Sequence, residues 1–563
     1  MRREVSVVNK KVCSFPILFA LLALLIGTCA VVFPASAQAA PTSTGSITVS
    51  GTVASSYDAY QIFSANVVDG DSDAKIATDL AWASDAVRDA ALPVLHSAGM
   101  PNSQTTAQEA AEWLNTDSHL TSALSAQLAR SLQSSGAVPV ALNAGTAAEL
   151  PCGYWLIVAD DDAIAQGEAG TAPIMALVGG SAVTVKPKAA TPKVSKHVLE
   201  DSTAAWQKAA DATVADDLYW RLSATVPAGL TAYDTYTVRF VDTMSAGLDP
   251  SKVAASMRVY VAAGADGGFD AVSTGKDGRA GTEPAKGWTD ITAQCATKVA
   301  ADGKTFTVRT GDLIAALGGA DAFTAGARVV AVYNAPLNSA CNHGIAKGNP
   351  NEVYLRYPRS PFADQSGDAG FTRTPSDDAC AYTWDLALTK RGSDGDKPLA
   401  GAVLSIADDR GRTLAADGTW DAEGKATVTT GEDGRVTVSG VDSGKLEVRE
   451  LKAPKGYTAF EGTRSVTVKA EGLDVDQVAA AKPKLTITAE SPLRADSADG
   501  STGSLEASLI NTPTGTPPSI TTGGFMPSTG DMAMYAAAAA AVAGAALIVV
   551  ALLVKRGGGS HKE

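Results

Sequence analysis

The sequence has few of the residues from which metal and enzyme sites are built. Its 563 residues include only five histidines and six cysteines. No Cys-x-x-Cys pair occurs, which argues against a zinc site, and the histidines show no metal-ligand or catalytic-triad spacing. A nucleophile elbow, a phosphate-binding loop and a dinucleotide fingerprint are also missing. We therefore expect no metal and no cofactor.

An excess of basic residues is lacking as well. Acidic residues outnumber basic residues by 60 to 46, and the net charge is −14. Binding to a phosphate backbone needs clustered lysine and arginine, so we expect no nucleic-acid partner. The acidic stretch Asp69–Asp73 resembles a calcium loop, but Ala74 and Leu80 stand where such a loop needs Gly and Glu. We interpret it as a solvated loop.

Residues 1–39 have the features of a secretory signal peptide. Four basic residues lie within the first eleven positions, an apolar run covers 12–33, and small residues follow at Ala35, Ala37 and Ala39. This order predicts export and cleavage after Ala37 or Ala39. An uncleaved N-terminal anchor is the alternative.

Export would leave four cysteines in an oxidising compartment: Cys152, Cys295, Cys341 and Cys380. Four cysteines allow three disulfide pairings, and their spacing does not choose between them. We favour Cys341 with Cys380.

An apolar segment of about 20 residues follows Tyr535, which is long enough to cross a bilayer. Lys555 and Arg556 come directly after it and place the tail on the cytoplasmic side. Taken alone, this segment predicts a plain membrane anchor.

A pentapeptide before this segment changes the interpretation. Met526-Pro527-Ser528-Thr529-Gly530 follows a stretch rich in Gly, Pro and Thr, which predicts an unstructured tether. Pentapeptide, apolar span and basic tail together resemble the cell-wall sorting signal of Gram-positive surface proteins. Methionine replaces the usual leucine, a swap of similar volume. The resemblance implies that a sortase cuts between Thr529 and Gly530 and joins Thr529 to an amine.

The mature part of the chain has mainly strand periodicity. An alternating segment at Ser46–Ser50 and an apolar run at Gly153–Val158 enclose an Ala-rich helical stretch between Asp85 and Ser135. Residues 194–361 and 382–511 contain short strand-like runs separated by Gly, Asp and Pro, which is typical of β-sandwiches. We predict a mainly β fold of tandem immunoglobulin-like sandwiches, with a helical insertion in the first.

The sharpest internal motif lies in the last β-rich region. The run from Leu446 to Tyr457, LEVRELKAPKGY, resembles the glutamate box of collagen-adhesin B-type (Cna-B) pilin domains. Segments around Lys390 and Asn511 match the first and last strands of that family. The resemblance implies an amide bond between Lys390 and Asn511, with Glu450 as the catalyst.

Burial makes this reaction physically sound. An apolar interior lowers the pKa of a lysine, and only the neutral amine attacks. A buried carboxyl group can carry a proton and polarise the Asn carboxamide. The alternative is a buried Lys–Glu–Asn network without a bond.

The middle β-rich region resembles the fimbrial isopeptide-forming D2 domain. The resemblance rests on segments that contain Lys196, Asp242 and Asn351. It implies that these residues are the nucleophile, the catalytic carboxyl and the acceptor, respectively. Asn349 is a second candidate acceptor, and Asp242 as a surface residue at a strand end is the alternative.

The segment Val183–Lys188 resembles the pilin motif, which supplies the lysine for polymerisation. Lys186 stands where that motif has tyrosine. The resemblance assigns the intermolecular bond to Lys188, with Lys186 and Lys193 as further candidates. A solvated linker lysine is the alternative interpretation.

These patterns predict six regions. They are a signal peptide (1–39), an N-terminal pilin domain (40–188), a D2 domain (189–375), a Cna-B type domain (376–513), a tether with the sorting pentapeptide (514–530), and a transmembrane segment with a basic tail (531–563).

The resemblance implies a shaft-forming subunit of a covalently polymerised, cell-wall-anchored surface pilus that supports adhesion. Its partners would be a sortase, copies of itself, other pilins, peptidoglycan and a surface ligand that the sequence does not identify. It would not be a turnover enzyme, because each internal site acts once on itself. A wall-anchored monomeric adhesin is the first alternative, and a secreted hydrolase with β-sandwich accessory domains is the second.

Overall fold

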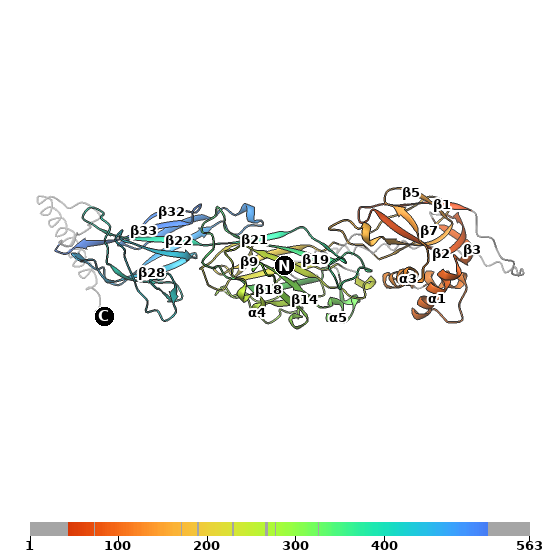
Figure 1. Ribbon diagram of the computed structural model, residues 1–563, viewed down its shortest axis with the longest axis horizontal. Coiled ribbons are helices and arrows are strands. Elements are labelled where there is room, and N and C mark those ends of the chain that lie inside the picture. The colour runs from red at the N-terminus through yellow and green to blue at the C-terminus, as the bar shows by residue number, and fades with distance from the viewer. Residues whose placement is uncertain are drawn as a thin grey trace, which may run out of the picture.

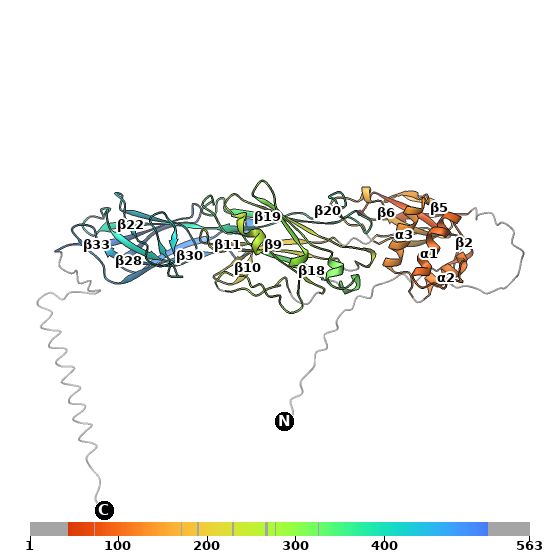
Figure 2. The ribbon, with the colours of Figure 1, turned by 60° about the horizontal axis from the view of Figure 1, so that its bottom comes forward.

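The computed structural model describes residues 43–515, apart from 72–73, 117, 171, 188–190, 228–229, 265–267, 276 and 325. Three β-domains lie end to end and form an elongated molecule, as both ribbon views show (Figures 1 and 2). The predicted signal peptide, sorting pentapeptide and C-terminal apolar span lie outside the described residues. In the part that is described, no helix is long and apolar enough to span a membrane.

The first domain combines two sheets with three helices. Its elements are β1 (Thr44–Val49), β2 (Ser56–Asp69), β3 (Lys75–Trp82), α1 (Asp85–Ser97), α2 (Ala107–Asn115), α3 (Ser122–Ser135), β4 (Val140–Asn143), β5 (Ala147–Pro151), β6 (Gly153–Ala159), η1 (Asp161–Ala163), β7 (Ile174–Val178) and β8 (Val183–Val185). One sheet has the order β5-β1-β8, and the other has the order β3-β2-β6-β7 with β4 beside β2. The helices pack their apolar faces on β2 and β6.

Local sequence explains where these helices begin. Ser84, Thr106 and Thr121 precede α1, α2 and α3, and each hydroxyl oxygen accepts a hydrogen bond from a backbone N–H of the first turn. Such caps satisfy donors that the helix leaves unpaired. In α2, Glu109 completes a capping box with Thr106. The predicted helical insertion is therefore confirmed.

The second domain is a sandwich of two sheets. Its elements are β9 (Val194–Glu200), β10 (Ala205–Gln207), β11 (Ala209–Asp211), β12 (Tyr219–Thr225), η2 (Leu230–Ala232), β13 (Arg239–Met244), η3 (Pro250–Lys252), α4 (Val253–Ser256), β14 (Arg258–Ala262), β15 (Thr289–Asp290), η4 (Thr292–Gln294), β16 (Ala296–Val299), β17 (Thr305–Arg309), α5 (Leu313–Ala316), η5 (Ala320–Ala322), β18 (Arg328–Asn334), β19 (Asn349–Pro358), β20 (Phe371–Arg373) and β21 (Asp377–Tyr382). The sheet orders are β10-β9-β12-β18-β14-β15 and β11-β21-β19-β13-β17-β16, with β20 beside β19.

Alternation along the strands builds the core of this sandwich. In β13, Phe240 and Asp242 are fully buried, whereas Val241 between them is only partly buried. Phe306 and Trp220 fill the space between the sheets. The inward face therefore carries aromatic residues and one carboxylate together.

The third domain is a second sandwich. Its elements are β22 (Trp384–Gly392), β23 (Val403–Ala407), β24 (Thr413–Leu414), β25 (Trp420–Asp421), β26 (Val428–Thr429), β27 (Arg435–Val441), β28 (Gly444–Lys452), β29 (Tyr457–Thr458), β30 (Thr463–Glu471), η6 (Val478–Ala480), β31 (Lys484–Ala489), β32 (Leu493–Asp499) and β33 (Ser504–Pro513). One sheet has the order β27-β22-β33-β29 with β32 beside β33, and the other has β25-β24-β23-β28-β30-β31 with β26 beside β23. The first and last strands, β22 and β33, are parallel neighbours.

Direct hydrogen bonds join successive domains. Tyr357 of the second domain donates to the carbonyl of Gly167 of the first at 2.8 Å. Val214 of the second domain donates its backbone N–H to the carbonyl of Gly440 of the third at 2.9 Å. The predicted mainly β architecture is confirmed, and the described domains meet at packed joints.

Candidate intramolecular cross-link sites

Three polar side chains meet in the core of the third domain. Lys390 lies on β22, Asn511 on the neighbouring β33, and Glu450 on β28 of the facing sheet. The pairing sets Lys390 opposite Leu509 and Gly392 opposite Asn511. Lys390 and Asn511 are therefore diagonal neighbours on one face, and Glu450 reaches them from across the sandwich.

The contacts among these residues are close. The Asn511 amide Nδ2 donates to both Glu450 carboxylate oxygens, at 2.9 and 3.1 Å. The Lys390 Nζ lies 3.7 Å from Glu450 Oε1 and donates to the carbonyl of Leu509 at 3.1 Å. Both ionisable side chains are fully buried. The Asn511 Oδ1 has no hydrogen-bond partner among the described residues, so this acceptor is open to a proton donor.

Burial changes the ionisation of the lysine. It lowers the pKa of Lys390 to about 8, and the attraction of Glu450 opposes this shift only in part. A neutral amine is therefore accessible at moderate pH. Amine, carboxyl and carboxamide together have the composition needed for amide exchange.

The second domain contains a similar group. Lys196 lies on β9 of one sheet, and Asp242 and Asn351 lie on the neighbouring strands β13 and β19 of the other. All three are fully buried. The Lys196 Nζ forms a hydrogen-bonded ion pair with Asp242 Oδ2. The predicted nucleophile, carboxyl and acceptor are thus brought together between the sheets.

A tyrosine connects these three residues. The Tyr333 hydroxyl on β18 accepts from Lys196 Nζ at 2.9 Å and from Asn351 Nδ2 at 2.8 Å, and it donates to Asp242 Oδ2 at 3.1 Å. Sequence reasoning missed Tyr333, because it lies in an ordinary apolar strand and only the strand register directs it here. Its ring packs edge-on against Phe306, with centroids 4.9 Å apart.

The aromatic surroundings tune this second group. Lys196 Nζ lies 5.5 Å from the centre of the Trp220 ring and 5.4 Å from that of Tyr333. Burial lowers the pKa of Lys196 to about 8, against the pull of Asp242. Burial also raises the pKa of Asp242, and the lysine opposes that shift. Both shifts favour a neutral amine beside a protonated carboxyl group.

The structure separates the two candidate acceptor asparagines. Asn349 accepts from the backbone N–H of Asn342 at 2.8 Å and donates to the carbonyls of Asn342 and Ala381 at 2.9 and 3.2 Å. Its amide is thus fully engaged in a loop contact. Asn351 contacts Tyr333, and its Oδ1 has no described partner. Geometry places Asn351 with Lys196.

The remaining predicted residues are less completely defined. Lys186 is exposed directly after β8, beside a largely apolar cavity of about 370 Å³ in the first domain. Lys193 is also exposed. Lys188 and the sorting pentapeptide lie outside the described residues.

The favoured disulfide is not formed. Cys341 and Cys380 are both free thiols in the structure, as are Cys152 and Cys295. Cys341 contacts the His343 ring at 3.5 Å, whereas Cys380 packs in the core of the third domain and contacts a backbone carbonyl. Cys341 and Cys380 belong to different hydrophobic clusters.

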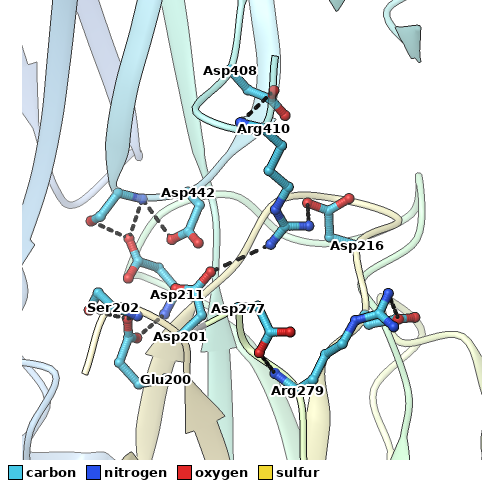
Figure 3. Close-up of polar contacts among 12 residues, drawn as sticks. Glu200, Asp201, Ser202, Asp211, Asp216, Asp277, Arg279, Asp408, Arg410 and Asp442 are labelled. Carbon is cyan, nitrogen blue, oxygen red and sulfur yellow. Dashed lines mark hydrogen bonds and ion pairs between the residues drawn. The ribbon is translucent and has the colours of Figure 1, made fainter. Parts of the chain in front are cut away.

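Carboxyl groups gather where the second and third domains meet (Figure 3). Asp211 accepts from Trp384 Nε1 at 2.7 Å and from the Ser443 N–H at 2.9 Å, both in the third domain. Glu200 accepts from the Asp211 N–H at 3.2 Å. Burial, followed by repulsion from Asp211, raises the pKa of Glu200 to about 7 and that of Asp442 well above its ordinary value.

Arginines from the third domain complete this joint. Arg412 pairs with Asp216 of the second domain at 2.5 Å, and Arg410 pairs with the same carboxylate at 3.0 Å. Arg410 also lies 3.7 Å from Asp201. In the described part of the chain, no group of three or more His, Cys, Asp or Glu side chains is arranged to hold a metal ion.

Known proteins resemble parts of this chain. The family described as the SpaA prealbumin-like fold domain matches residues 385–482. The trypsin-resistant surface T6 protein of Streptococcus pyogenes serotype M6 is 30% identical over 143 residues, which is 24% of this chain and 24% of that protein. The chain thus matches about a quarter of that relative's length.

Solved structures give further similarities. The T6 backbone pilin of S. pyogenes serotype M6 has a TM-score of 0.45 and 17% identity, over 85% of this chain and all of that one. The full-length major pilin SpaD of Corynebacterium diphtheriae has a TM-score of 0.40 and 15% identity over the same shares. Residues 385–482 thus match the family described as the SpaA prealbumin-like fold domain, and a segment of 143 residues is similar to a streptococcal surface protein.

Proposed function

We propose that this chain is the shaft-forming subunit of a covalently assembled surface pilus, stiffened by one internal amide bond in each of its last two domains. The observation that carries the proposal is the repeated buried group of lysine, carboxyl and asparagine. Two successive domains place such a group between their sheets, and each has a lysine whose pKa burial lowers to about 8.

The internal reaction is an amide exchange. The neutral lysine Nζ attacks the asparagine Cγ, a new C–N bond forms, and the bond from Cγ to Nδ2 breaks. The carboxyl group protonates the leaving nitrogen and receives a proton from the lysine, so that ammonia departs. Glu450 serves Lys390 and Asn511. Asp242, with the Tyr333 hydroxyl as a positioning group, serves Lys196 and Asn351.

The placement of these bonds suits a protein under tension. The chain enters the third domain along β22 and leaves it along β33, and these neighbouring strands carry Lys390 and Asn511. A bond here would bypass the 120 residues between them. Tension along the shaft would then pass through covalent bonds, and unfolding under force would be blocked.

Polymerisation requires an acyl donor at one end of each subunit and an amine that accepts the acyl group at the other end. We assign the donor to Thr529 of the sorting pentapeptide and the acceptor to Lys188, after β8. In the described part, β8 belongs to the domain at one end of the molecule and β33 to the domain at the other. The apolar cavity beside Lys186 supports this assignment, because an extended segment from a neighbouring subunit could rest there. A sortase would act as partner, and pili on the cell surface would be the product.

A denaturing gel of cell-wall extracts tests this function. A ladder of covalent multimers is expected from the native chain, and Lys188→Arg should abolish it, whereas Lys193→Arg should leave it intact. A single band from the native chain would instead support the wall-anchored monomeric adhesin. Peptide mapping of the ladder would identify the joined lysine directly.

A further inference from the structure

Four arginines form one row across a sheet of the second domain. Arg309 on β17 pairs with Arg239 on β13, Arg239 pairs with Arg356 on β19, and Arg356 pairs with Arg373 on β20. Directly paired residues project from the same face, and like charges in such positions destabilise a sheet. Residues next to the row in sequence, such as Phe240, face the core. The row therefore lies on the outer face.

This row has little compensating charge. Asp368 pairs with Arg239 at 2.5 Å and with Arg356 at 3.0 Å. Among the described residues it is the only carboxylate in ion-pair contact with the row. Arg309 donates to a backbone carbonyl, and Arg373 stacks over the Tyr354 ring with its guanidinium carbon 5.2 Å from the ring centre. Since arginine stays protonated, one carboxylate faces four positive charges on a chain of net charge −14.

A cleft opens at one end of the row, at the joint between the first and second domains. Its volume is about 430 Å³, and its lining includes Ile164, Gln166, Tyr354, Arg356, Arg359 and Arg373. The first two residues come from the first domain. Arg359 donates to the Asp161 carbonyl at 3.1 Å and lies 3.9 Å from the exposed Asp162 carboxylate, which fixes its guanidinium at the edge of the cleft. Three guanidinium groups and a tyrosine ring thus line one hollow, and among the described residues Arg373 is the one of the three without a carboxylate in ion-pair contact.

We propose that this cleft binds an acidic oligosaccharide, through carboxylate or sulfate groups on its sugars. A guanidinium fork matches the oxygens of both anions and donates two parallel hydrogen bonds to them. The Ile164 side chain and the edge of the half-buried Tyr354 ring, over which Arg373 stacks, supply an apolar wall for a sugar. The volume lies within the range of small-ligand sites. The ion pairs of Asp368 with Arg239 and Arg356 show that these arginines bind a carboxylate.

An oligosaccharide explains the lining better than a bare anion does. A free phosphate or sulfate ion needs only guanidinium groups, whereas this cleft also offers an aromatic and an aliphatic surface. A long polyanion such as a nucleic acid needs a basic track, and the row ends at Arg309 and Arg373. The inference does not depend on either internal bond or on polymerisation, since it uses only the joint between the first two domains.

Binding to the mature chain tests the inference. The probes are a heparin-derived oligosaccharide (sulfated), a hyaluronan oligosaccharide (carboxylated) and a neutral cello-oligosaccharide of matched length, measured by titration calorimetry. At least one acidic probe should bind, more weakly as salt rises, and the neutral probe should not. The acidic probe that binds more tightly identifies the anion.

Three variants locate the site. Arg373→Glu should weaken binding about tenfold or more, because it removes a charge-assisted contact and adds repulsion. Tyr354→Ala should weaken it severalfold. Arg449→Glu is the matched control, because Arg449 is exposed in the third domain and undergoes the same charge change. The affinity of the Arg449→Glu chain for the acidic probe should equal that of the native chain.

Other outcomes would overturn the inference. They are no binding of either acidic probe, equal weakening by Arg373→Glu and Arg449→Glu, or equally tight binding of a single-stranded oligonucleotide, which would indicate a general polyanion surface. Folding is controlled separately: Arg373→Ala should leave the melting temperature unchanged or slightly raised, since it relieves like-charge opposition in the row.

Discussion

Replacing Glu450 with glutamine tests whether the third domain is covalently closed. The substitution keeps the size of the side chain but removes the group that carries the proton. Without it, Lys390 and Asn511 should remain unjoined, because the amide of glutamine cannot accept the lysine proton. The native mature chain should weigh less than its sequence by two ammonia molecules, and the E450Q chain by one.

The stability change can be estimated from chain closure. Lys390 and Asn511 are 121 positions apart, and a cross-link that closes a loop of this size restricts the unfolded chain by about 5 kcal/mol in the chain-entropy treatment. For a domain of this size, such a loss lowers the melting temperature by about 20 °C. Calorimetry of the native and E450Q chains should show that decrease in the transition of the third domain, and Asn511→Ala should lower it to a similar extent.

Two results would refute this reasoning. A native chain at its full unmodified mass would mean that the buried group is a hydrogen-bonded network without a bond. A mass deficit combined with a melting decrease below about 5 °C in E450Q would mean that the bond exists but does not govern stability. Lys452→Ala is a suitable control, because Lys452 is an exposed residue on the same strand, β28.

Three further predictions concern other parts of the chain. In the second domain, Asp242→Asn should restore the mass of one ammonia, whereas Tyr333→Phe should retain the bond but slow its formation by about tenfold, followed by mass against time after refolding; an unaltered rate would exclude a positioning role for the hydroxyl. At the joint between the second and third domains, the folded chain holds a proton on Glu200 up to a pKa of about 7, whereas the unfolded residue releases it near 4.5. The folded state thus binds the extra proton in this window, so stability should fall as pH rises from about 4.5 to 7, and Glu200→Gln should flatten that slope in melting curves; an unchanged slope would contradict the assignment. In polymerisation, Lys186→Arg should leave the covalent ladder intact if Lys188 is the acceptor, and loss of the ladder in that variant alone would transfer the role to Lys186.

The order of the secondary-structure elements and of the reactive motifs along the chain could be predicted from local patterns. Strand alternation, the helical spacing between Asp85 and Ser135, and the motif around Glu450 are properties of neighbouring residues. Backbone geometry sets periods of 2 and 3.6 and thereby determines which side chains share a face. For this reason the fold class could be predicted from the sequence, whereas Lys390, Glu450 and Asn511 were named through the resemblance of their motifs to Cna-B pilin domains.

Contacts between distant strands were decided only by the tertiary structure. Asn349 and Asn351 lie two positions apart and share a face of β19, so periodicity could not decide which of them is the acceptor. The tertiary structure distinguishes them, because Asn351 shares the Tyr333 hydroxyl with the Lys196 amine, whereas the Asn349 amide is engaged elsewhere. The register of β18 likewise placed Tyr333 in this group, and Cys341 and Cys380 are free thiols in the structure.

The arginine row shows this limit most clearly. Its four members lie between positions 239 and 373, and nothing in their local sequence links them. Strand register places them on one line. Register depends on how whole sheets pack, because a shift of one residue would turn every side chain to the opposite face. The sequence by itself determined the elements and the reactive residue types, and tertiary packing decided which of those residues meet.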